Sequence, residues 1–170
     1  MIYEEIFKAL NAKKVNYVVV GGVGLVLHGV VRLTADLDII VRLETKNLTK
    51  FISVIKELGY KPKAPVKAEE FIDNEKRERW RKEKRVQVFS FYHPKKPATL
   101  LDVFVNEPID YETLENAKEV IQAGSLKIPV VSRQHLIELK KISGRPQDIA
   151  DIKALKEVMK IEKKERGKKH

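Results

Sequence analysis

The sequence predicts an α+β fold in which a small mixed sheet is flanked by helices and followed by further C-terminal helices. Short apolar runs rich in β-branched residues alternate with segments whose apolar residues recur at helical spacing. The chain has 170 residues and contains no internal repeat or low-complexity linker. We therefore expect one domain over residues 1–170.

The composition excludes several classes of protein. Hydrophobic residues make up 43% of the chain, too many for a disordered one, and the absence of cysteine rules out disulfides and thiolate metal sites. The uncharged run over residues 15–31 contains four glycines and reaches only the short limit of a membrane span. We expect neither a signal peptide nor a membrane partner, and hence a cytoplasmic protein.

The N-terminal part is predicted to alternate between helices and strands. Ile2, Ile6 and Leu10 have the spacing of an apolar helix face, and Gly29 is suited to close a helix. The next two apolar segments are rich in valine and isoleucine, which favours strands. The expected elements are a helix over residues 2–13, a buried strand over 16–20, a short helix over 23–28 and a strand over 36–42.

The middle of the chain combines apolar periodicity with dense charge. Gly59 is suited to end one helix, and Trp80 is expected to anchor the next helix to the core. The expected elements are a helix over residues 46–58, a loop or short edge strand over 60–66, a charged helix over 69–84, a strand over 86–92 and a turn over 93–97.

The C-terminal part is predicted to be mainly helical. Ser132 is a suitable N-cap, and Gly144 and Pro146 separate two helices. The tail from about residue 163 is basic and is expected to fray. The expected elements are a strand over residues 99–105, a helix within 108–123, an extended segment over 125–131, and helices over 132–142 and 147–161.

A glycine pair and a carboxylate pair are the first candidate site. Gly21 and Gly22 follow the first strand, where glycine lets the backbone turn sharply and approach a ligand. Asp36 and Asp38 are alternate residues of the next strand, so both side chains project from one face. Two like charges among apolar neighbours require a counter-ion, and a divalent cation supplies one. The segment therefore predicts a phosphate site beside a Mg²⁺ site.

Asp102 is a third candidate acid, within the predicted strand over residues 99–105. Its neighbours are Leu100, Leu101, Val103 and Phe104. Burying an unpaired carboxylate there would cost several kcal/mol. We therefore expect Asp102 to have a functional partner.

These residues resemble the motif of the polymerase-β-type nucleotidyltransferase fold. The family has a Gly-Gly or Gly-Ser turn, then Asp-x-Asp about ten residues later, then a third acid. The form found here, GGVGLVLHGVVRLTADLD, resembles the minimal bacterial and archaeal branch that includes the abortive-infection-type toxins. One residue departs from the family: many members have Ser where this chain has Gly22. Backbone N–H groups would then bind the phosphate alone.

The resemblance implies a metal-dependent transfer of a nucleoside monophosphate. Asp36, Asp38 and Asp102 would bind Mg²⁺ or Mn²⁺ and a nucleoside triphosphate such as ATP, with Asp36 and Asp38 shared between two ions. Asp102 would serve the acceptor-side ion and take the proton of the attacking hydroxyl.

Basic and acidic residues late in the chain are also assigned by the resemblance. Lys140 and Arg145 would neutralise the nucleotide phosphates. Asp148 and Asp151 are candidates for the acid that accompanies them, although both also suit the first turn of a helix.

The acceptor is left open by the sequence. The net charge of +10 is concentrated in basic clusters over residues 76–85 and 156–170, which favours RNA or tRNA as the acceptor and a toxin with a cognate antitoxin, although charge runs also form ordinary solvated faces. Two alternatives remain: an inactive module that binds nucleotide or nucleic acid, and a transferase that modifies a small molecule such as an antibiotic. The basic residues of the first cluster are Lys76, Arg77, Arg79, Arg81, Lys82, Lys84 and Arg85.

Overall fold

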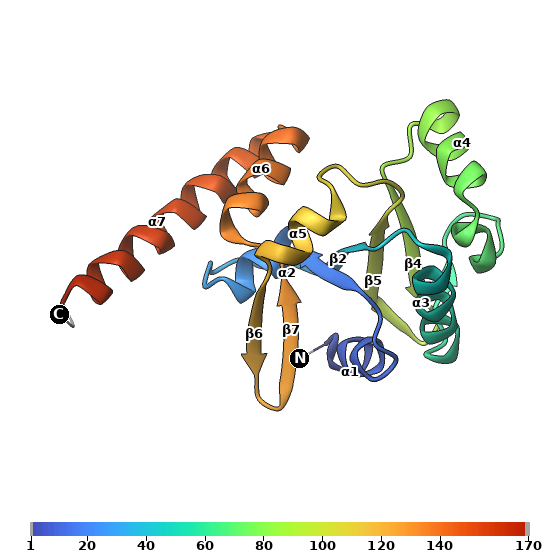
Figure 1. Ribbon diagram of the computed structural model, residues 1–170, viewed down its shortest axis with the longest axis horizontal. Helices are drawn as coiled ribbons and strands as arrows, with labels where there is room; N and C mark the ends of the chain where they lie inside the picture. Colours follow the sequence, from blue (N-terminus) through green and yellow to red (C-terminus); the bar gives the residue numbers. More distant parts are fainter. Residues whose placement is uncertain (1, 169–170) are drawn as a thin grey trace.

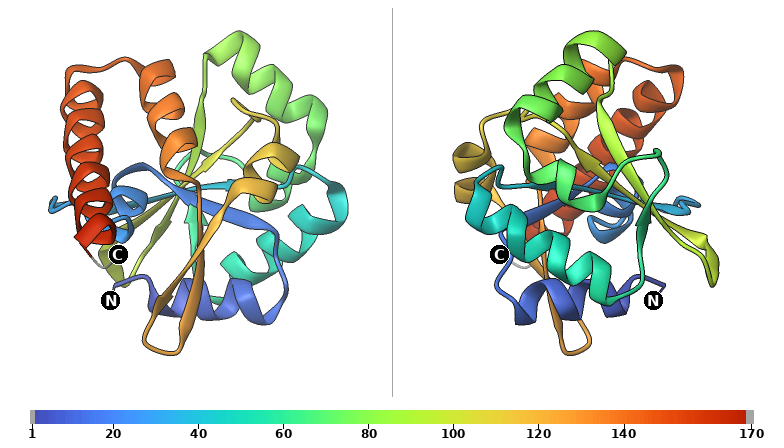
Figure 2. Two further views of the ribbon diagram at one scale, coloured as in Figure 1. Left: turned by 60° about the vertical axis from the view of Figure 1, so that its left-hand side comes forward. Right: turned by 90° about the vertical axis from the view of Figure 1, so that its right-hand side faces the viewer.

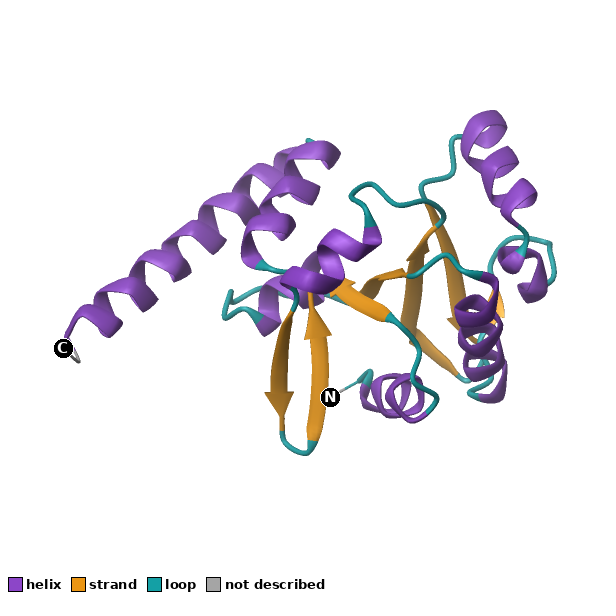
Figure 3. Ribbon diagram, viewed as in Figure 1, coloured by secondary structure: helices purple, strands orange, loops and turns teal. Residues whose placement is uncertain are grey.

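The computed structural model describes residues 2–168 and consists of helices packed on both sides of a mixed sheet (Figures 1 and 3). The elements in chain order are α1 (Glu4–Ala12), β1 (Tyr17–Val20), α2 (Gly21–Leu27), β2 (Asp36–Val41), α3 (Thr45–Glu57), β3 (Lys61–Pro62), η1 (Ala68–Ile72), α4 (Asn74–Lys84), β4 (Val88–His93), β5 (Lys96–Phe104), α5 (Tyr111–Ala117), β6 (Glu119–Ala123), β7 (Leu126–Val130), α6 (Arg133–Ser143) and α7 (Pro146–Lys168).

The seven strands lie in the order β3-β4-β5-β2-β1-β7-β6. The two central neighbours β2 and β5 are parallel, as are β1 and β7, and the other neighbouring pairs are antiparallel. The predicted α+β fold with a mixed sheet is confirmed. The sheet places strands that are far apart in the sequence side by side at its centre.

The two faces of the sheet are covered by different helices. Tyr17, Val19 and Leu37 point toward α1, α3, η1 and α4, where they join the larger apolar cluster. Val18 and Val20 point the other way, toward α2, α5, α6 and α7. Because side chains alternate along a strand, Asp36 and Asp38 lie on this second face. The acids are therefore kept out of the larger apolar cluster.

The turn between β1 and α2 is sharper than the sequence predicts. The helix begins at Gly21 rather than at residue 23, because the positive φ of 64° at Gly21 reverses the chain immediately after the strand. Glycine is required at this position for conformation as well as for space.

The segment over residues 69–84, predicted as one helix, forms two separate elements, η1 and α4. A 3₁₀ turn, η1, ends at Ile72. The next residue, Asp73, accepts hydrogen bonds from the N–H groups of Glu75 and Lys76 through its side chain and so starts α4. Trp80 stacks on Phe89 and is only 9% exposed, which confirms its predicted core position.

The C-terminal half differs from the prediction in two places. β6 lies in a segment where only a helix is expected, and it forms a hairpin with β7. α7 continues to Lys168, past its predicted end at residue 161, so the basic tail expected to fray is helical as far as the structure describes it. In Figure 1 this helix projects well beyond the sheet. Among residues 2–168, no helix is long and apolar enough to cross a membrane.

Candidate active site

The three predicted carboxylates come together on neighbouring strands. β2 and β5 pair in parallel register with Asp38 opposite Asp102, and Asp36 is two residues before Asp38 on the same face. All three residues are half-buried. Residues opposite each other on paired strands have side chains about 5 Å apart. The fold therefore concentrates three negative charges over two strands.

Gly21 lies directly against this acid group. Val20 pairs with Asp38, and a Cβ placed on Gly21 would lie 2.2 Å from Asp38 Oδ2. A Cβ on Gly22 would lie 2.5 Å from Thr34 Oγ1. Neither position has space for a side chain, so the glycine pair brings backbone, rather than side chains, up to the Asp38 carboxylate.

Burial, followed by the charges of Asp102 and Asp36, raises the pKa of Asp38 to about 7, against the opposing charges of Lys140 and Arg145. A carboxylate group of this kind is stabilised by bound positive charge. The donor set of three aligned carboxylates therefore fits Mg²⁺ or Mn²⁺, which prefer oxygen ligands. Among residues 2–168, no group of three His, Cys, Asp or Glu side chains is placed to hold a metal ion.

Ser90 and Lys63 belong to this site, and sequence reasoning did not find them. Ser90 on β4 lies opposite Asp102, and its Oγ donates a hydrogen bond to Asp102 Oδ1 at 2.5 Å. The Lys63 N–H in turn donates to the Ser90 carbonyl oxygen at 2.9 Å. The only signal in the sequence is that Ser90 alternates with Phe89 and Phe91, which places it opposite the core.

Lys140 is part of a buried ion network between α6 and α7. Its Nζ lies 3.2 Å from Asp148 Oδ1 and 2.9 Å from Asp151 Oδ2. Arg32, in the loop before β2, lies 2.6 Å from Asp151 Oδ2. Lys140 is 8% exposed, and its ammonium acts on Asp38 through charge. The network thus attaches the C-terminal helices to the loop that leads into the acid pair.

Arg145 is placed differently from Lys140. Its Nε lies 3.0 Å from Asp148 Oδ2, but its side chain is 71% exposed. Burial alone would raise the pKa of Asp148, yet hydrogen bonds from Arg145, Ser143 and Lys140 hold that pKa well below its ordinary value. Of the two predicted phosphate-binding residues, Arg145 is accessible and Lys140 is already occupied by carboxylates.

Much of the first basic cluster is not available to a polyanion. Arg77 is 3% exposed and donates to the carbonyl oxygen of Phe71 at 2.5 Å, so its expected place on the RNA-binding surface is wrong. The cause is the aromatic core under α4, over which the guanidinium packs. Lys76, Arg81 and Lys82 form ion pairs with glutamates. Within the described part of the chain, the exposed basic residues of this cluster without an ion pair are Arg79, Lys84 and Arg85.

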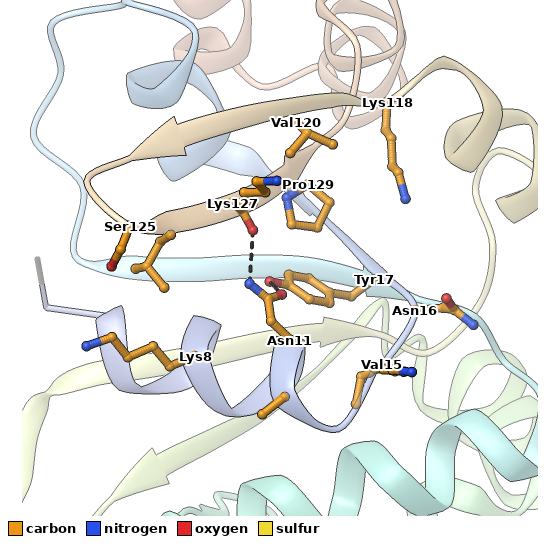
Figure 4. Close-up of a pocket in the computed structure, with 13 residues that line it drawn as sticks. Lys8, Asn11, Val15, Asn16, Tyr17, Lys118, Val120, Ser125, Lys127 and Pro129 are labelled. Atoms are coloured by element: carbon orange, nitrogen blue, oxygen red, sulfur yellow. Dashed lines mark hydrogen bonds between the residues drawn. The ribbon is translucent and has the colours of Figure 1, made fainter.

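A groove of about 720 Å³ lies at the other end of the sheet, between α1 and the β6–β7 hairpin (Figure 4). Asn11 crosses it, donating from Nδ2 to the Lys127 carbonyl oxygen at 2.9 Å and accepting a hydrogen bond from the Tyr17 hydroxyl. The groove borders the first residues of β1 and β7, whereas Gly21 follows the last residue of β1. It is therefore separate from the carboxylates.

The chain matches no known family model and no curated protein sequence. Its fold is similar to that of several solved structures. The lincosamide antibiotic adenylyltransferase LnuA, solved with lincomycin bound, is 22% identical, with a TM-score of 0.58, over 90% of this chain and 93% of its own.

Two further structures show the same likeness. A putative nucleotidyltransferase from Thermotoga maritima is 16% identical with a TM-score of 0.57, over 89% of this chain and 88% of its own. ANT(2")-Ia in complex with adenylyl-2"-tobramycin is 12% identical with a TM-score of 0.58, over 99% of this chain and 97% of its own. The similarity thus extends over nearly the whole chain in each case.

Proposed function

The chain has the nucleotidyltransferase fold of the polymerase-β type, and on this premise we propose that it transfers a nucleoside monophosphate from a nucleoside triphosphate to a hydroxyl acceptor. The observation that carries the proposal is the parallel register that puts Asp38 opposite Asp102, with Gly21 against Asp38. This arrangement combines a carboxylate group suited to a cation with backbone that a phosphate can approach.

Asp36, Asp38 and Asp102 would hold Mg²⁺ or Mn²⁺, and the bound metal would neutralise charge on the transferring phosphoryl group and lower the pKa of the attacking hydroxyl. Gly21 and Gly22 bring their backbone N–H groups near the triphosphate. The exposed guanidinium of Arg145 reaches the phosphates, and Lys140 holds Asp148 and Asp151 in place behind it.

Asp102 accepts the proton of the acceptor hydroxyl. The hydroxyl oxygen attacks the α-phosphorus, the bond to the leaving phosphate oxygen breaks, and pyrophosphate departs. Burial raises the pKa of Asp102 above its ordinary value, which suits a group that must take up a proton. Ser90 already donates to Oδ1, so the proton goes to Oδ2.

The acceptor favoured by charge is RNA, such as the end of a tRNA, which would suit a toxin with a cognate antitoxin. The net charge of +10 and the unpaired Arg79, Lys84 and Arg85 support a polyanionic partner. The second candidate is an antibiotic-type small molecule, since LnuA was solved with lincomycin and ANT(2")-Ia with adenylyl-2"-tobramycin.

Calorimetry with labelled-nucleotide transfer assays tests the proposal. We expect nucleoside triphosphate to bind with Mg²⁺ and not in EDTA, and labelled nucleotide to be transferred to one of three pools: RNA, protein or small molecules. Asp36→Asn and Asp38→Asn should weaken binding, while Glu83→Gln, on the exposed face of α4, serves as the charge-matched control. Equal binding in EDTA contradicts the site, and firm binding without transfer to any pool favours a binding module.

A further inference from the structure

The polar row at the carboxylate site continues beyond Asp102. Across the sheet, Gly21 follows the residue that pairs with Asp38, Asp38 is opposite Asp102, and Asp102 is opposite Ser90. Lys63, just after β3, closes the row through the hydrogen bond from its N–H to the Ser90 carbonyl. Five positions from five consecutive strands or their ends therefore lie in one line.

Lys63 supplies a positive charge at the far end of this row. Its side chain is exposed, and none of the ion pairs within residues 2–168 involves it. Pro62 pairs with Phe91, so Lys63 continues the register opposite Ser90, which itself pairs with Asp102. Because opposite residues of paired strands share a face, the Lys63 side chain leaves the sheet on the same face as Ser90 and Asp102.

The carboxylates consequently have positive charge on both sides. On the Asp38 side, Lys140 and Arg145 are engaged with Asp148 and Asp151. On the Asp102 side, Lys63 has no such partner in the part of the chain that the structure describes. If the triphosphate lies against Gly21, the acceptor must approach from the side of Asp102, where it meets Lys63.

Resting on the proposed function, we propose that Lys63 determines acceptor specificity by binding a phosphate of the acceptor near its reactive hydroxyl. A lysine ammonium is a compact charge that pairs well with phosphate oxygens. The same charge repels the amines of a polycationic acceptor such as tobramycin. The site thereby selects a phosphate-bearing acceptor, of which an RNA end is the obvious form.

The test compares Lys63→Gln with Lys61→Gln, which removes the same charge from an exposed lysine two residues earlier, in β3. Lys61 lies opposite Tyr92, which pairs with Leu100, so it is two residues along the strands from the row that contains Ser90 and Asp102. The probe is a fluorescent single-stranded RNA oligonucleotide, titrated by anisotropy over a salt series with Mg²⁺ and a non-hydrolysable nucleoside triphosphate. Tobramycin serves as the competing cationic ligand, and nucleotide binding is measured separately by calorimetry.

We expect Lys63→Gln to weaken RNA binding roughly fivefold at low salt and to reduce the slope of log affinity against log salt by about 0.7. Lys61→Gln should change neither, and Lys63→Glu should weaken RNA binding further while allowing tobramycin to bind. Nucleotide binding should remain that of the wild type in all three variants.

Three results would overturn the proposal: Lys63→Gln binding RNA as the wild type does, both glutamine variants weakening it equally, or the wild type preferring tobramycin to RNA. In all three cases nucleotide binding would be unchanged, so the proposed function would stand. Loss of Mg²⁺-dependent nucleotide binding by the wild type is a different result, which refutes the proposed function and, with it, the role of Lys63.

Discussion

A side chain on Gly21 would occupy the space that the Asp38 carboxylate fills. The Gly21 φ of 64° is one that residues with a side chain rarely adopt, and an added Cβ would overlap the Asp38 carboxylate. The glycine is therefore tied to the acid pair by geometry.

Gly21→Ala is expected to destabilise the protein and to reduce nucleotide binding, because the methyl group displaces Asp38. The control is Gly124→Ala, since Gly124 has a similar φ of 62° but nothing within 4 Å of its added Cβ. Gly124→Ala should lower the free energy of unfolding by only about 1–2 kcal/mol, which is the cost of a left-handed backbone conformation for a residue with a side chain. Denaturant unfolding and calorimetry measure both effects. Equal costs for the two variants would contradict the overlap.

Asp38 should also make stability depend on pH. Its pKa rises to about 7 on folding, mainly through burial and then through Asp102 and Asp36, so the folded state favours the protonated form. The free energy of unfolding should therefore fall as the pH rises from about 4 to 7. Asp38→Asn should lessen this fall and be more stable than the wild type at pH 8 without metal. Urea unfolding at pH 5 and pH 8 checks the sign, and added Mg²⁺ should restore the wild type at pH 8.

Asp102→Asn separates binding from chemistry. The substitution keeps the shape of the side chain and its place opposite Asp38. It removes the negative charge that would serve the acceptor side in the proposed mechanism. Nucleotide should bind with near wild-type affinity, while transfer falls by orders of magnitude. Single-turnover transfer beside calorimetry checks this, and transfer at the wild-type rate would exclude Asp102 from the mechanism.

At the scale of elements, α6 and α7 are joined by the buried network around Lys140. Lys140→Met would leave Asp148 and Asp151 without that partner in a buried position. We expect a loss of about 3–5 kcal/mol in the free energy of unfolding. Lys141→Met, on an exposed neighbour, should have almost no effect. Denaturant unfolding of the two variants checks the difference, and equal stabilities would show that the network contributes little.

Whether a segment forms a helix or a strand was largely predictable, because the spacing of its apolar residues shows which of its faces is buried. The missed β6 is an edge strand in which no residue is fully buried, so the pattern is weak. The contact between Ser90 and Asp102 was not predictable for a different reason. Counting back from the His93–Lys96 pair would put Ser90 opposite Thr99, but an irregularity between Tyr92 and His93 shifts the register so that Ser90 meets Asp102.

At the scale of the whole molecule, the sequence predicted the candidate acids better than their surroundings. Asp36 and Asp38 share a face through strand alternation alone, and the resemblance added Asp102. Lys63 and Arg32 are brought to the site by the fold and could not be predicted from the sequence. A single exposed lysine and an arginine in a loop have no pattern that distinguishes them from other residues of their kind.

In the two predicted basic clusters, the residues that form no ion pair within residues 2–168 lie on two separate elements, α4 with its C-cap and α7. The helix α4 and the turn between α6 and α7 lie at the same end of the molecule, from which α7 runs toward the opposite end (Figure 2). Reversing the charges of Arg79 and Lys84 on α4, and of Arg85 at its C-cap, should flatten the salt dependence of RNA binding. Reversal of Lys156, Lys163 and Lys164 on α7 tests the other surface. Anisotropy over a salt series distinguishes them, and unchanged slopes in both would point to a small acceptor.

The strand order also determines when the site can form while the chain is being synthesised. Val19 pairs with Val130, and Arg32 bonds to Asp151, so the surroundings of the acids come from opposite halves of the chain. Contacts between such distant residues form late and slowly. When β1 and β2 of a nascent chain have left the ribosome, β7, α6 and α7 have not yet been synthesised. The carboxylates therefore acquire their basic neighbours only near the end of translation, and we expect nucleotide binding to begin at that stage.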